Sequence, residues 1–433
     1  MTYNSTKLLA AVMVLAGLLM VGRNLSVVSM LQIEAENTSP SQAGNTSPSQ
    51  CVLPEASEVD FASQVGELVS SCAPSLEPGN FTCPAYLAAA ERGRPLRFTV
   101  ADELPWFKRK STGGNSSEFF KSELDGKPAI LRVGPEEDFD FAVFFAYGYV
   151  EESDIKKLLS GLRAIGKRAM VITTADMVTA PTICDGGHIF FATYLQLSKN
   201  GTVWGSVSKP KQPLDVSDRG GEPCFMFQIP YTYNPLPDAA VFARRLERPR
   251  TKLATFSGTI MSYPKRSWIE DLKGFPDISL HLVNWWAPDV TWEQRVAMSE
   301  TFYRDLNEST FGLCPRGNGY SSMRFIQTVA ESTLPVLMDD WILPYGESMC
   351  SFAIRARLEG DHLTFVRELR KLAARPDWIA KRLNNMRRFV ECYWPNRDNG
   401  LSAPFVVHVA RRALAGDLLK WMCSILGVNN SRT

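Results

Sequence analysis

The chain has 433 residues, of which 45% are hydrophobic and 21% charged. This length exceeds one ordinary domain and provides for two sizeable cores. Its formal net charge is +1, so it has no general attraction to nucleic acid or to acidic membranes. Any anion must be bound by locally placed arginines, and we expect no nucleic-acid partner.

The chain begins with an apolar run at residues 8–22, behind Lys7, that is short for a membrane-spanning helix. Two interpretations stay open. The run is an uncleaved signal anchor if the weakly apolar residues 25–33 continue it past Arg23, or it is a cleaved signal peptide, although no Ala-x-Ala site follows promptly. In both cases the bulk of the chain enters the secretory lumen. We assign residues 1–33 to a short cytoplasmic tail and this anchor.

The next segment is rich in Ser, Thr and Pro and contains the sequence NTSPSQ twice, at 37–42 and at 45–50. Such a composition cannot bury a core, so we predict a flexible, glycosylated, low-complexity stem over residues 34–94. N-x-Ser/Thr acceptor sequences, in the stem and beyond it, begin at Asn37, Asn45, Asn80, Asn115, Asn200, Asn307 and Asn429.

Nine cysteines in an oxidising compartment predict disulfides, with at least one thiol left over or paired between chains. Cys51, Cys72 and Cys83 cluster near the end of the stem, and we expect local bridges among them. Cys314 lies inside a predicted strand, where a packed thiol is expected. No two cysteines have zinc-ligand spacing and the four histidines are scattered, so we predict no metal site.

The globular region divides near residues 235–250, where the sequences NPLPD and ARRLERPR are typical of an exposed connection. The first half, residues 95–240, alternates short apolar runs with a helical pattern. The second half, residues 241–400, repeats this theme and ends in a helix-rich stretch at 361–389. We predict strands at 96–100, 139–145, 169–173, 253–256, 278–283, 311–314 and 336–338, and a helix at 153–165.

Alternation of strands and helices favours parallel sheets flanked by helices, which is an α/β fold. In such sheets ligands bind beyond the carboxyl ends of the strands. In the second half this rule selects Gly258 with the downstream Arg266, the Arg316–Gly317 turn, Arg324 with Gln327, and Asp339 with Asp340. In the first half it selects Asp102 or Glu103, and Asp176.

Residues 310–345 carry the most specific pattern. A short apolar run leads into a turn, and Ser321 or Ser322 can then cap a helix. Arg324 falls in the first turn of that helix, where the macrodipole disfavours a cation unless an anion is bound. Together with Arg316 and the free N–H groups of the helix start, Arg324 can cradle a diphosphate. The alternative is an arginine that is solvated or paired with Glu331.

These motifs, in this order, resemble those of the exostosin-like glycosyltransferases, family 47, whose signature is F-x-L-x-P-x-G, then S-x-R, then a strand and D-x-W-x-L-P-F. Similar family elements precede them at 97–107, 134–147, 227–232 and 250–258, so the resemblance extends over residues 97–389. The matching positions of the signature are Phe311, Leu313, Pro315, Gly317, Ser322, Arg324, Pro335, Val336, Asp340, Leu343 and Pro344.

The resemblance implies a GT-B fold, in which two Rossmann-like domains face each other across a cleft and the C-terminal helix of residues 401–433 packs back across them. The domain at 95–240 would take the acceptor, and the domain at 241–400 the nucleotide sugar. It further implies a Golgi type II membrane protein that is an inverting transferase, takes a UDP-sugar as donor and acts on a polysaccharide or glycoprotein glycan. No cofactor is expected. Self-association or association with related transferases stays open.

Within that activity, Asp102 or Asp176 would be the base that takes the proton of the acceptor hydroxyl. Arg266 would neutralise the departing UDP. The simpler alternatives are that Asp102 caps the turn at 104–105 and that Arg266 is an ordinary surface arginine.

Gln327 departs from the family pattern, because the family usually carries an acidic residue there that is expected to bind ribose hydroxyls. A neutral amide reaches as far but bonds more weakly. Ala175 also stands where the family often has histidine. A second hypothesis is therefore a catalytically inactive partner that binds glycan or stabilises an active transferase. A third, an unrelated hydrolase, is disfavoured because no Gly-x-Ser-x-Gly motif occurs.

Overall fold

The computed structural model describes residues 72, 77–90, 92–110, 114–127, 129–146, 152–174, 187–192, 225–229, 237, 239–284, 287–317, 321–339, 341, 343, 345–394, 401–418 and 421. The chain divides into two units, Met1–Gln50 and Cys51–Thr433, and every described residue belongs to the second. The predicted anchor and the repeats of the stem lie outside the described residues. Among the residues that are described, no helix is long and apolar enough to cross a membrane.

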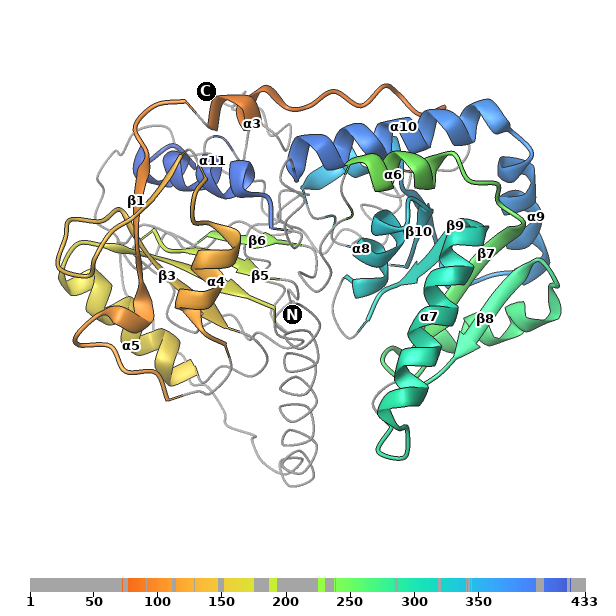
Figure 1. Ribbon diagram of the computed structural model, residues 1–433, viewed down its shortest axis with the longest axis horizontal. Helices are drawn as coiled ribbons and strands as arrows, with labels where there is room; N and C mark the ends of the chain where they lie inside the picture. Colours follow the sequence, from red (N-terminus) through yellow and green to blue (C-terminus); the bar gives the residue numbers. More distant parts are fainter. Residues whose placement is uncertain are drawn as a thin grey trace, which may run out of the picture. The chain divides into compact units, whose positions relative to one another are not determined.

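The first sheet is parallel throughout, with six strands in the order β2-β1-β3-β4-β5-β6 (Figure 1). The strands predicted at 96–100, 139–145 and 169–173 and the helix predicted at 153–165 are confirmed. Strands β2, β5 and β6 were not predicted, because three or four residues are too few to show a period. The strands and the long helix are β1 (Leu96–Val100), β2 (Ile130–Arg132), β3 (Phe141–Ala146), β4 (Arg168–Thr173), β5 (Ile189–Ala192), β6 (Phe225–Gln228) and α5 (Glu152–Ala164).

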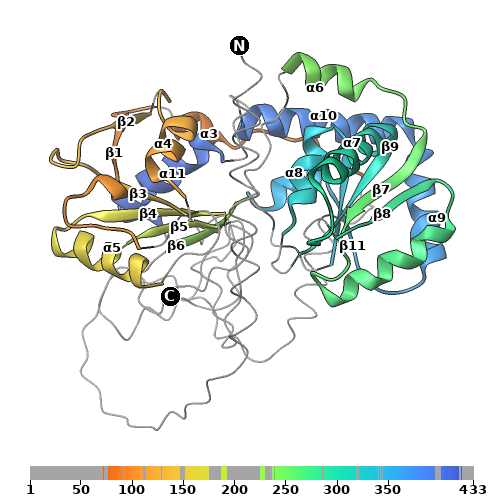
Figure 2. The ribbon, with the colours of Figure 1, turned by 60° about the horizontal axis from the view of Figure 1, so that its bottom comes forward.

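Both faces of the first sheet are covered by helices (Figure 2). Alternate residues of β3 show this most clearly, because Phe141 and Val143 pack in the core that contains α4 (Ser116–Glu123), whereas Ala142 and Phe144 pack in the core that contains α5. A strand buried on both faces must be apolar at every position, which explains the uninterrupted sequence FAVFFA.

The second sheet is also parallel, with five strands in the order β11-β10-β9-β7-β8. The strands predicted at 253–256, 278–283, 311–314 and 336–338 are confirmed, as is the helix-rich stretch. The elements are β7 (Lys252–Gly258), β8 (Ile278–Leu282), β9 (Ser309–Pro315), β10 (Leu334–Met338), β11 (Ile354–Ala356), the 3-10 segments η2 (Pro264–Gly274) and η3 (Gly346–Ser351), and helices α6 (Ala239–Leu246), α7 (Trp292–Glu308), α8 (Met323–Ala330), α9 (His362–Ala373) and α10 (Pro376–Tyr393).

Helices α7 and α8 lie side by side on the second sheet (Figures 1 and 2). Gly312, in the middle of β9, permits their close approach. A Cβ atom at this position would lie 2.5 Å from the Thr328 side chain of α8 and 3.1 Å from that of Leu306 of α7. The distance to Thr328 is shorter than real Cβ contacts, so a larger residue would force Thr328 to shift; glycine is favoured here by packing rather than by its backbone angles.

Residues at the end of the predicted stem belong to the folded unit. Phe81 and Leu87 are buried, and residues Ala85–Ala90 form helix α3. The disulfides join Cys72 to Cys350 and Cys83 to Cys392, across 278 and 309 residues, so the prediction of local bridges for Cys72 and Cys83 is wrong. Disulfide partners depend on the tertiary fold, which cysteine spacing does not reveal.

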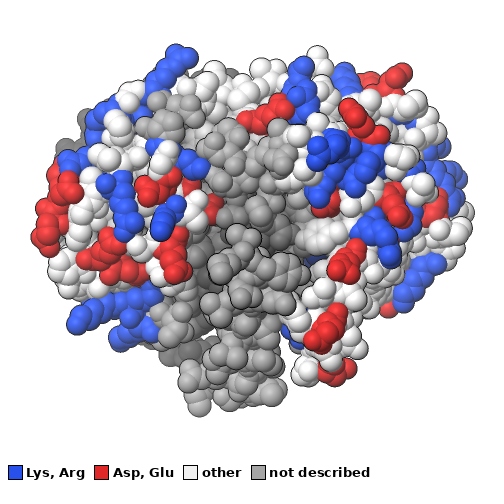
Figure 3. All heavy atoms as spheres, viewed as in Figure 1, with Lys and Arg blue, Asp and Glu red and all other residues white. Residues whose placement is uncertain are grey.

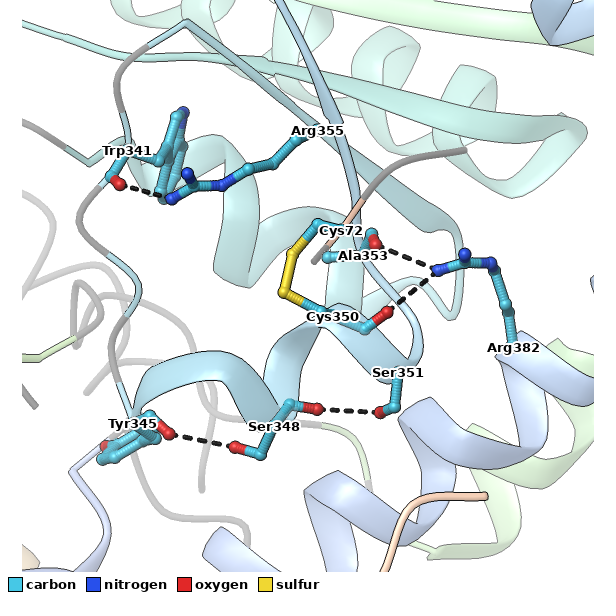
Figure 4. The surroundings of a disulfide bond; sticks show 9 residues. All are labelled: Cys72, Trp341, Tyr345, Ser348, Cys350, Ser351, Ala353, Arg355 and Arg382. Atoms are coloured by element: carbon cyan, nitrogen blue, oxygen red, sulfur yellow. Dashed lines mark hydrogen bonds between the residues drawn. A yellow bond between two sulfur atoms is a disulfide. The ribbon is translucent and has the colours of Figure 1, made fainter. Parts of the chain in front are cut away.

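The disulfide of Cys72 and Cys350 is supported by a buried arginine of α10 (Figure 4). The Nη1 atom of Arg382 donates to the Cys350 and Ala353 carbonyls, at 3.1 and 3.0 Å. Arg382 also lies against the Trp378 ring, at 4.2 Å, and burial lowers its pKa to about 10. The N-terminal segment is fixed to the second half of the chain by the two disulfides and by Asn385 of α10, whose Oδ1 accepts from the Phe81 N–H at 3.0 Å.

The C-terminal helix α11 (Ala403–Leu414) lies within the predicted segment 401–433 and contacts residues from both halves. The ring of Phe405 lies 5.8 Å from that of Phe227 in β6 and 5.1 Å from that of Tyr345, which follows β10. Arg168 of β4 donates to the Ala413 carbonyl at 2.5 Å. Helix α11 therefore connects the first sheet to the core beside the second.

His408 of α11 is buried between two aromatic rings, those of Tyr86 at 4.5 Å and Trp421 at 4.7 Å. Burial, followed by the charge of Arg412, lowers the pKa of His408 from 6.5 to about 4, with Asp417 opposing. The fold thus favours neutral His408, and stability should fall as the pH drops from 6.5 towards 4.

We predict that His408→Phe, which keeps the ring contacts, reduces this acid sensitivity. The wild type should lose about 2 kcal/mol more than the variant in free energy of unfolding between pH 7 and pH 5. Urea unfolding of both proteins at the two pH values measures the difference. Equal pH dependence would mean that His408 is not held neutral by the fold.

Candidate functional site

The candidate site lies at the carboxyl end of the second sheet, where ligands bind in sheets of this kind. Strand β7 ends at Gly258, which is opposite Leu282 of β8, and Pro315 of β9 is opposite Met338 of β10. The residues that follow these strands therefore come together, as the strand rule predicts.

Arg266 of η2 binds the backbone that leaves these strands. Its Nε atom donates to the Arg316 carbonyl at 2.7 Å, Nη1 to the Thr259 carbonyl at 2.8 Å and Nη2 to the Pro315 carbonyl at 2.9 Å. Only 6% of the residue is exposed. The structure thus gives Arg266 a positioning role: it holds the ends of β7 and β9 at a fixed separation, which differs from both the leaving-group role and the surface arginine considered above.

Arg316 is buried over the ring of Tyr263, with 4.4 Å between the guanidinium carbon and the ring centre. The Tyr263 hydroxyl donates to Asp339 Oδ2 at 2.5 Å, and Lys265 Nζ lies 3.1 Å from Oδ1 of the same carboxylate. Asp339 adopts a left-handed backbone with φ of 69°, a conformation that costs energy outside glycine and is frequent at functional positions. Asp340 lies outside the described residues.

The turn after β9 closes on itself, because the Gly317 N–H donates to the Ser321 carbonyl at 2.9 Å. Ser322 then caps α8, with its Oγ accepting from the Arg324 N–H at 3.3 Å. This confirms the cap predicted at Ser321 or Ser322. An added Cβ on Gly317 would lie 3.9 Å from Nη2 of Arg266, so this turn and the Arg266 guanidinium are neighbours.

Arg324 is 7% exposed and lies at the first turn of α8, between the end of β7 and helix α7. Its guanidinium carbon is 4.7 Å from the centre of the Phe302 ring, and a Cβ on Gly258 would be 3.5 Å from its Nη2. Burial lowers the pKa of Arg324 to about 10. Glu331, the alternative partner, instead forms ion pairs with Arg245 at 2.9 Å and Arg248 at 3.9 Å.

Gln327 lies one turn after Arg324 and uses both ends of its amide. Its Oε1 accepts from Arg324 Nη1, and its Nε2 donates to the Tyr303 hydroxyl of α7 at 3.3 Å. The side chain that was predicted to contact ribose therefore also orients Arg324 and connects it to α7.

Asp102 follows β1 in the first sheet, and both its carboxylate oxygens are engaged by the protein. Oδ1 accepts from Arg109 Nε and Oδ2 from Arg109 Nη2, both at 3.1 Å, and Oδ2 also accepts from the Ser116 N–H at 3.1 Å. These bonds fix the start of α4, a structural role unlike the turn cap considered above. Its use as a base stays a prediction, and Asp176 lies outside the described residues.

The described residues contain no group of three or more His, Cys, Asp or Glu side chains placed to hold a metal ion. Cys314 is buried at the end of β9, and burial raises its pKa to about 12. It is therefore the packed thiol that the sequence predicted, and it is unsuited to nucleophilic work.

Comparison with protein families identifies the region that carries this site. Residues 187–357 match the Exostosin GT47 domain. Within residues 187–357 the resemblance found in the sequence is confirmed, and this region has the sequence of an exostosin-type glycosyltransferase domain. The matched region contains the second sheet and every described candidate residue except Asp102 and the glycosylation acceptors Asn80 and Asn115.

Among solved structures, this transferase is similar to a mutant of S. aureus TarM in complex with Fondaparinux, alpha-GlcNAc-glycerol and UDP, with a TM-score of 0.30 and 11% identity over 58% of this chain and 55% of that one. It is also similar to the glycosyltransferase WaaG, with a TM-score of 0.30 and 11% identity over 61% of this chain and 98% of that one. A third similar structure is a trehalose-phosphate synthase from Burkholderia vietnamiensis, with a TM-score of 0.33 and 12% identity over 64% of this chain and 72% of that one. No curated protein matches the chain. Similarity this weak carries no argument about the site.

Two residues of this site were not predicted from the sequence. Tyr303 gave no local signal, because its partner Gln327 lies 24 residues away. Tyr263 stands at the N-cap position of η2 and binds Asp339 across 76 residues. Asp339 itself was selected by the strand rule, because it directly follows a predicted strand.

We predict that Arg266→Ala destabilises the transferase by about 3 kcal/mol, because buried carbonyl groups at the ends of β7 and β9 would lose their donors. Lys265→Ala, which removes the half-exposed neighbour, should cost less than about 1 kcal/mol. Chemical denaturation of both variants gives the comparison. If Arg266→Ala retained wild-type stability but lost nucleotide binding, the positioning role would be wrong.

We also predict that Asn80 and Asn115 carry glycans whereas Asn307 does not. Asn80 and Asn115 are exposed, and Asn115 caps α4 through Oδ1, which leaves its amide nitrogen for the glycan. Asn307 is half-buried in α7, and its Oδ1 is buried. Peptide mass mapping after enzymatic deglycosylation in heavy-oxygen water measures occupancy. A glycan on Asn307 would contradict this assignment.

Proposed function

We propose that this protein is an inverting transferase that moves a sugar from a UDP-sugar donor to a polysaccharide or glycoprotein glycan. We place it in the Golgi membrane as a single-pass type II protein with its catalytic region in the lumen, the alternative being cleavage and secretion. The proposal includes the GT-B arrangement, with the two sheets facing each other across a cleft.

The observation that carries the proposal is the buried guanidinium of Arg324 at the capped start of α8, beside the end of β7. A planar guanidinium group matches the oxygen atoms of a phosphate, which it can bind through two parallel hydrogen bonds. The N–H groups at a helix start and the macrodipole favour a phosphate at this place. A UDP-sugar supplies such an anion through its diphosphate.

In the proposed reaction, the acceptor hydroxyl oxygen attacks the anomeric carbon from the side opposite the phosphate. The bond between that carbon and the phosphate oxygen breaks, and UDP leaves with the electron pair. A carboxylate of the first half takes the hydroxyl proton, for which Asp176 and Asp102 are the candidates. Positive charge near the diphosphate stabilises the transition state, because negative charge grows on the leaving oxygen.

A second candidate function is the inactive partner. Gln327 favours it, because its amide is engaged by Arg324 and Tyr303 and offers no carboxylate to the ribose. The active transferase and the inactive partner differ in whether they transfer a sugar. An experiment that distinguishes them must therefore measure transfer from a set of nucleotide-sugar donors as well as nucleotide binding.

We predict that Arg324→Ala weakens UDP binding at least about tenfold, since a charge-assisted bond contributes about 1.5–3 kcal/mol. Gln327→Ala should have a smaller effect, because it removes only the orientation of Arg324 and a neutral contact. Isothermal titration calorimetry with UDP, GDP and UMP measures both.

Arg388→Ala is the matched control, because Arg388 is exposed on α10. Circular dichroism and thermal unfolding establish that each variant is folded. Equal UDP affinity in the wild type and in folded Arg324→Ala would remove this site assignment. UDP binding without transfer to any acceptor would favour the inactive partner.

A further inference from the structure

An open surface pocket of about 560 Å³ lies beside α7, and one of its residues, Tyr303, also binds Gln327 of the candidate nucleotide site. Its walls come from Arg248 and Pro249, just before β7 begins, and from the C-terminal half of α7. The α7 side chains include those of Glu300, Tyr303, Arg304 and Asn307. The cavity is therefore at the amino end of the second sheet, whereas the candidate nucleotide site is at its carboxyl end.

The walls of this cavity carry both hydrogen-bond donors and acceptors. Arg248 and Arg304 provide guanidinium groups, and Glu300 and Glu308 provide carboxylates. The Oδ1 of Asn307 and the Nε and Nη2 of Arg248 are buried and make no hydrogen bond within the described part of the chain. These buried atoms are out of reach of a ligand, and Arg248 Nη2 also lies 3.9 Å from Glu331. The charged groups that a ligand can reach are those of the exposed residues Glu300 and Arg304.

The charges around the cavity are mixed rather than of one sign. Glu308 lies 3.0 Å from Lys252 Nζ, and Glu331, behind the wall, is shared by Arg245 and Arg248. Burial raises the pKa of Glu331. Burial is also the main reason that the pKa of Arg248 is lowered. Figure 3 shows basic and acidic groups interspersed over the face that carries α6 and α7. A strong anion would meet two carboxylates here, and a cation would meet two guanidinium groups.

A ligand that both donates and accepts suits such a wall, and sugar hydroxyls do so at every ring position. The rings of Tyr303 and Pro249 offer apolar surface for the C–H face of a pyranose. The volume is in the range of pockets that hold small ligands, about 300–1,000 Å³. We propose that this cavity is a second carbohydrate-binding site, which takes one or two neutral pyranose units independently of the nucleotide.

The backbone behind the cavity is held rigidly, as a binding site requires. Arg250 is largely buried, and its guanidinium donates to the carbonyls of Ser309 at 3.0 Å and Ser332 at 2.7 Å and to the Thr333 hydroxyl at 3.0 Å. Burial and the charge of Arg248 lower its pKa to about 10. These bonds fix the end of α7 against the start of β10, so the wall exists before any ligand arrives.

Ligand-observed NMR with the deglycosylated full-length protein, in a detergent without a sugar headgroup, tests the site. The probes are the methyl β-glycosides of glucose, galactose and xylose, with glucuronic acid and inorganic sulfate as anionic comparisons. We expect at least one neutral glycoside to bind with a Kd of about 1 mM, the weak range of affinity for small ligands. Saturating UDP should not displace it.

Arg304→Ala and Glu300→Gln should each weaken that binding about fivefold or more, because each removes a charged partner of a hydroxyl. Both residues are exposed, so the variants should fold, which thermal unfolding checks. Arg92→Ala, at an exposed arginine outside the cavity, is the matched control and should bind like the wild type.

Four results would overturn the proposal: absence of neutral-glycoside binding, binding that neither cavity variant alters, displacement of the glycoside by UDP, or binding only of glucuronate and sulfate. The last result would make the cavity an anion site. Displacement by UDP would place the sugar at the nucleotide site instead. None of these outcomes depends on whether Arg324 binds nucleotide, which the calorimetric titration decides separately.

Discussion

The candidate site depends on the hydrogen bonds that Arg266 donates to the backbone at the ends of β7 and β9. Through carbonyl groups of residues 259, 315 and 316, one side chain fixes where two strands stop and where the following turn begins. The position of that turn sets the position of Ser322, and the cap at Ser322 sets the first turn of α8. Arg324 reaches the end of β7 because each of these steps is fixed.

The buried and half-buried arginines of this transferase include two kinds. Arg250, Arg266 and Arg382 donate to backbone carbonyls and hold segments that are far apart in the sequence. Arg324 differs, because its backbone N–H donates to the cap of its own helix, its Nη1 donates to the Gln327 amide, and its guanidinium lies over the ring of Phe302. Backbone carbonyls satisfy N–H donors without neutralising charge, so the first kind is structural, whereas an arginine at a helix start is suited to a ligand anion.

Much of the fold was predictable because its signals are local. Buried parallel strands such as those at 311–314 and 336–338 are uninterrupted apolar runs, and the helix at 153–165 has a clear period. Strands β2, β5 and β6 gave no such signal because they are short. The order of the motifs around Arg324 also predicted the family, and the match over residues 187–357 confirmed it.

The sequence by itself determined the α/β class, the positions of the long elements, the cap of α8 and the family of the domain, because apolar period, capping residues and motif order are properties of neighbouring residues. Only the tertiary structure decided that Cys72 and Cys83 bond to residues 350 and 392, that Arg266 holds backbone, that Arg109 engages Asp102 and that Gln327 connects Arg324 to Tyr303. Packing between segments that are distant in the sequence determines the partner of a buried donor, carboxylate or thiol. Residue type and local spacing therefore do not predict that partner.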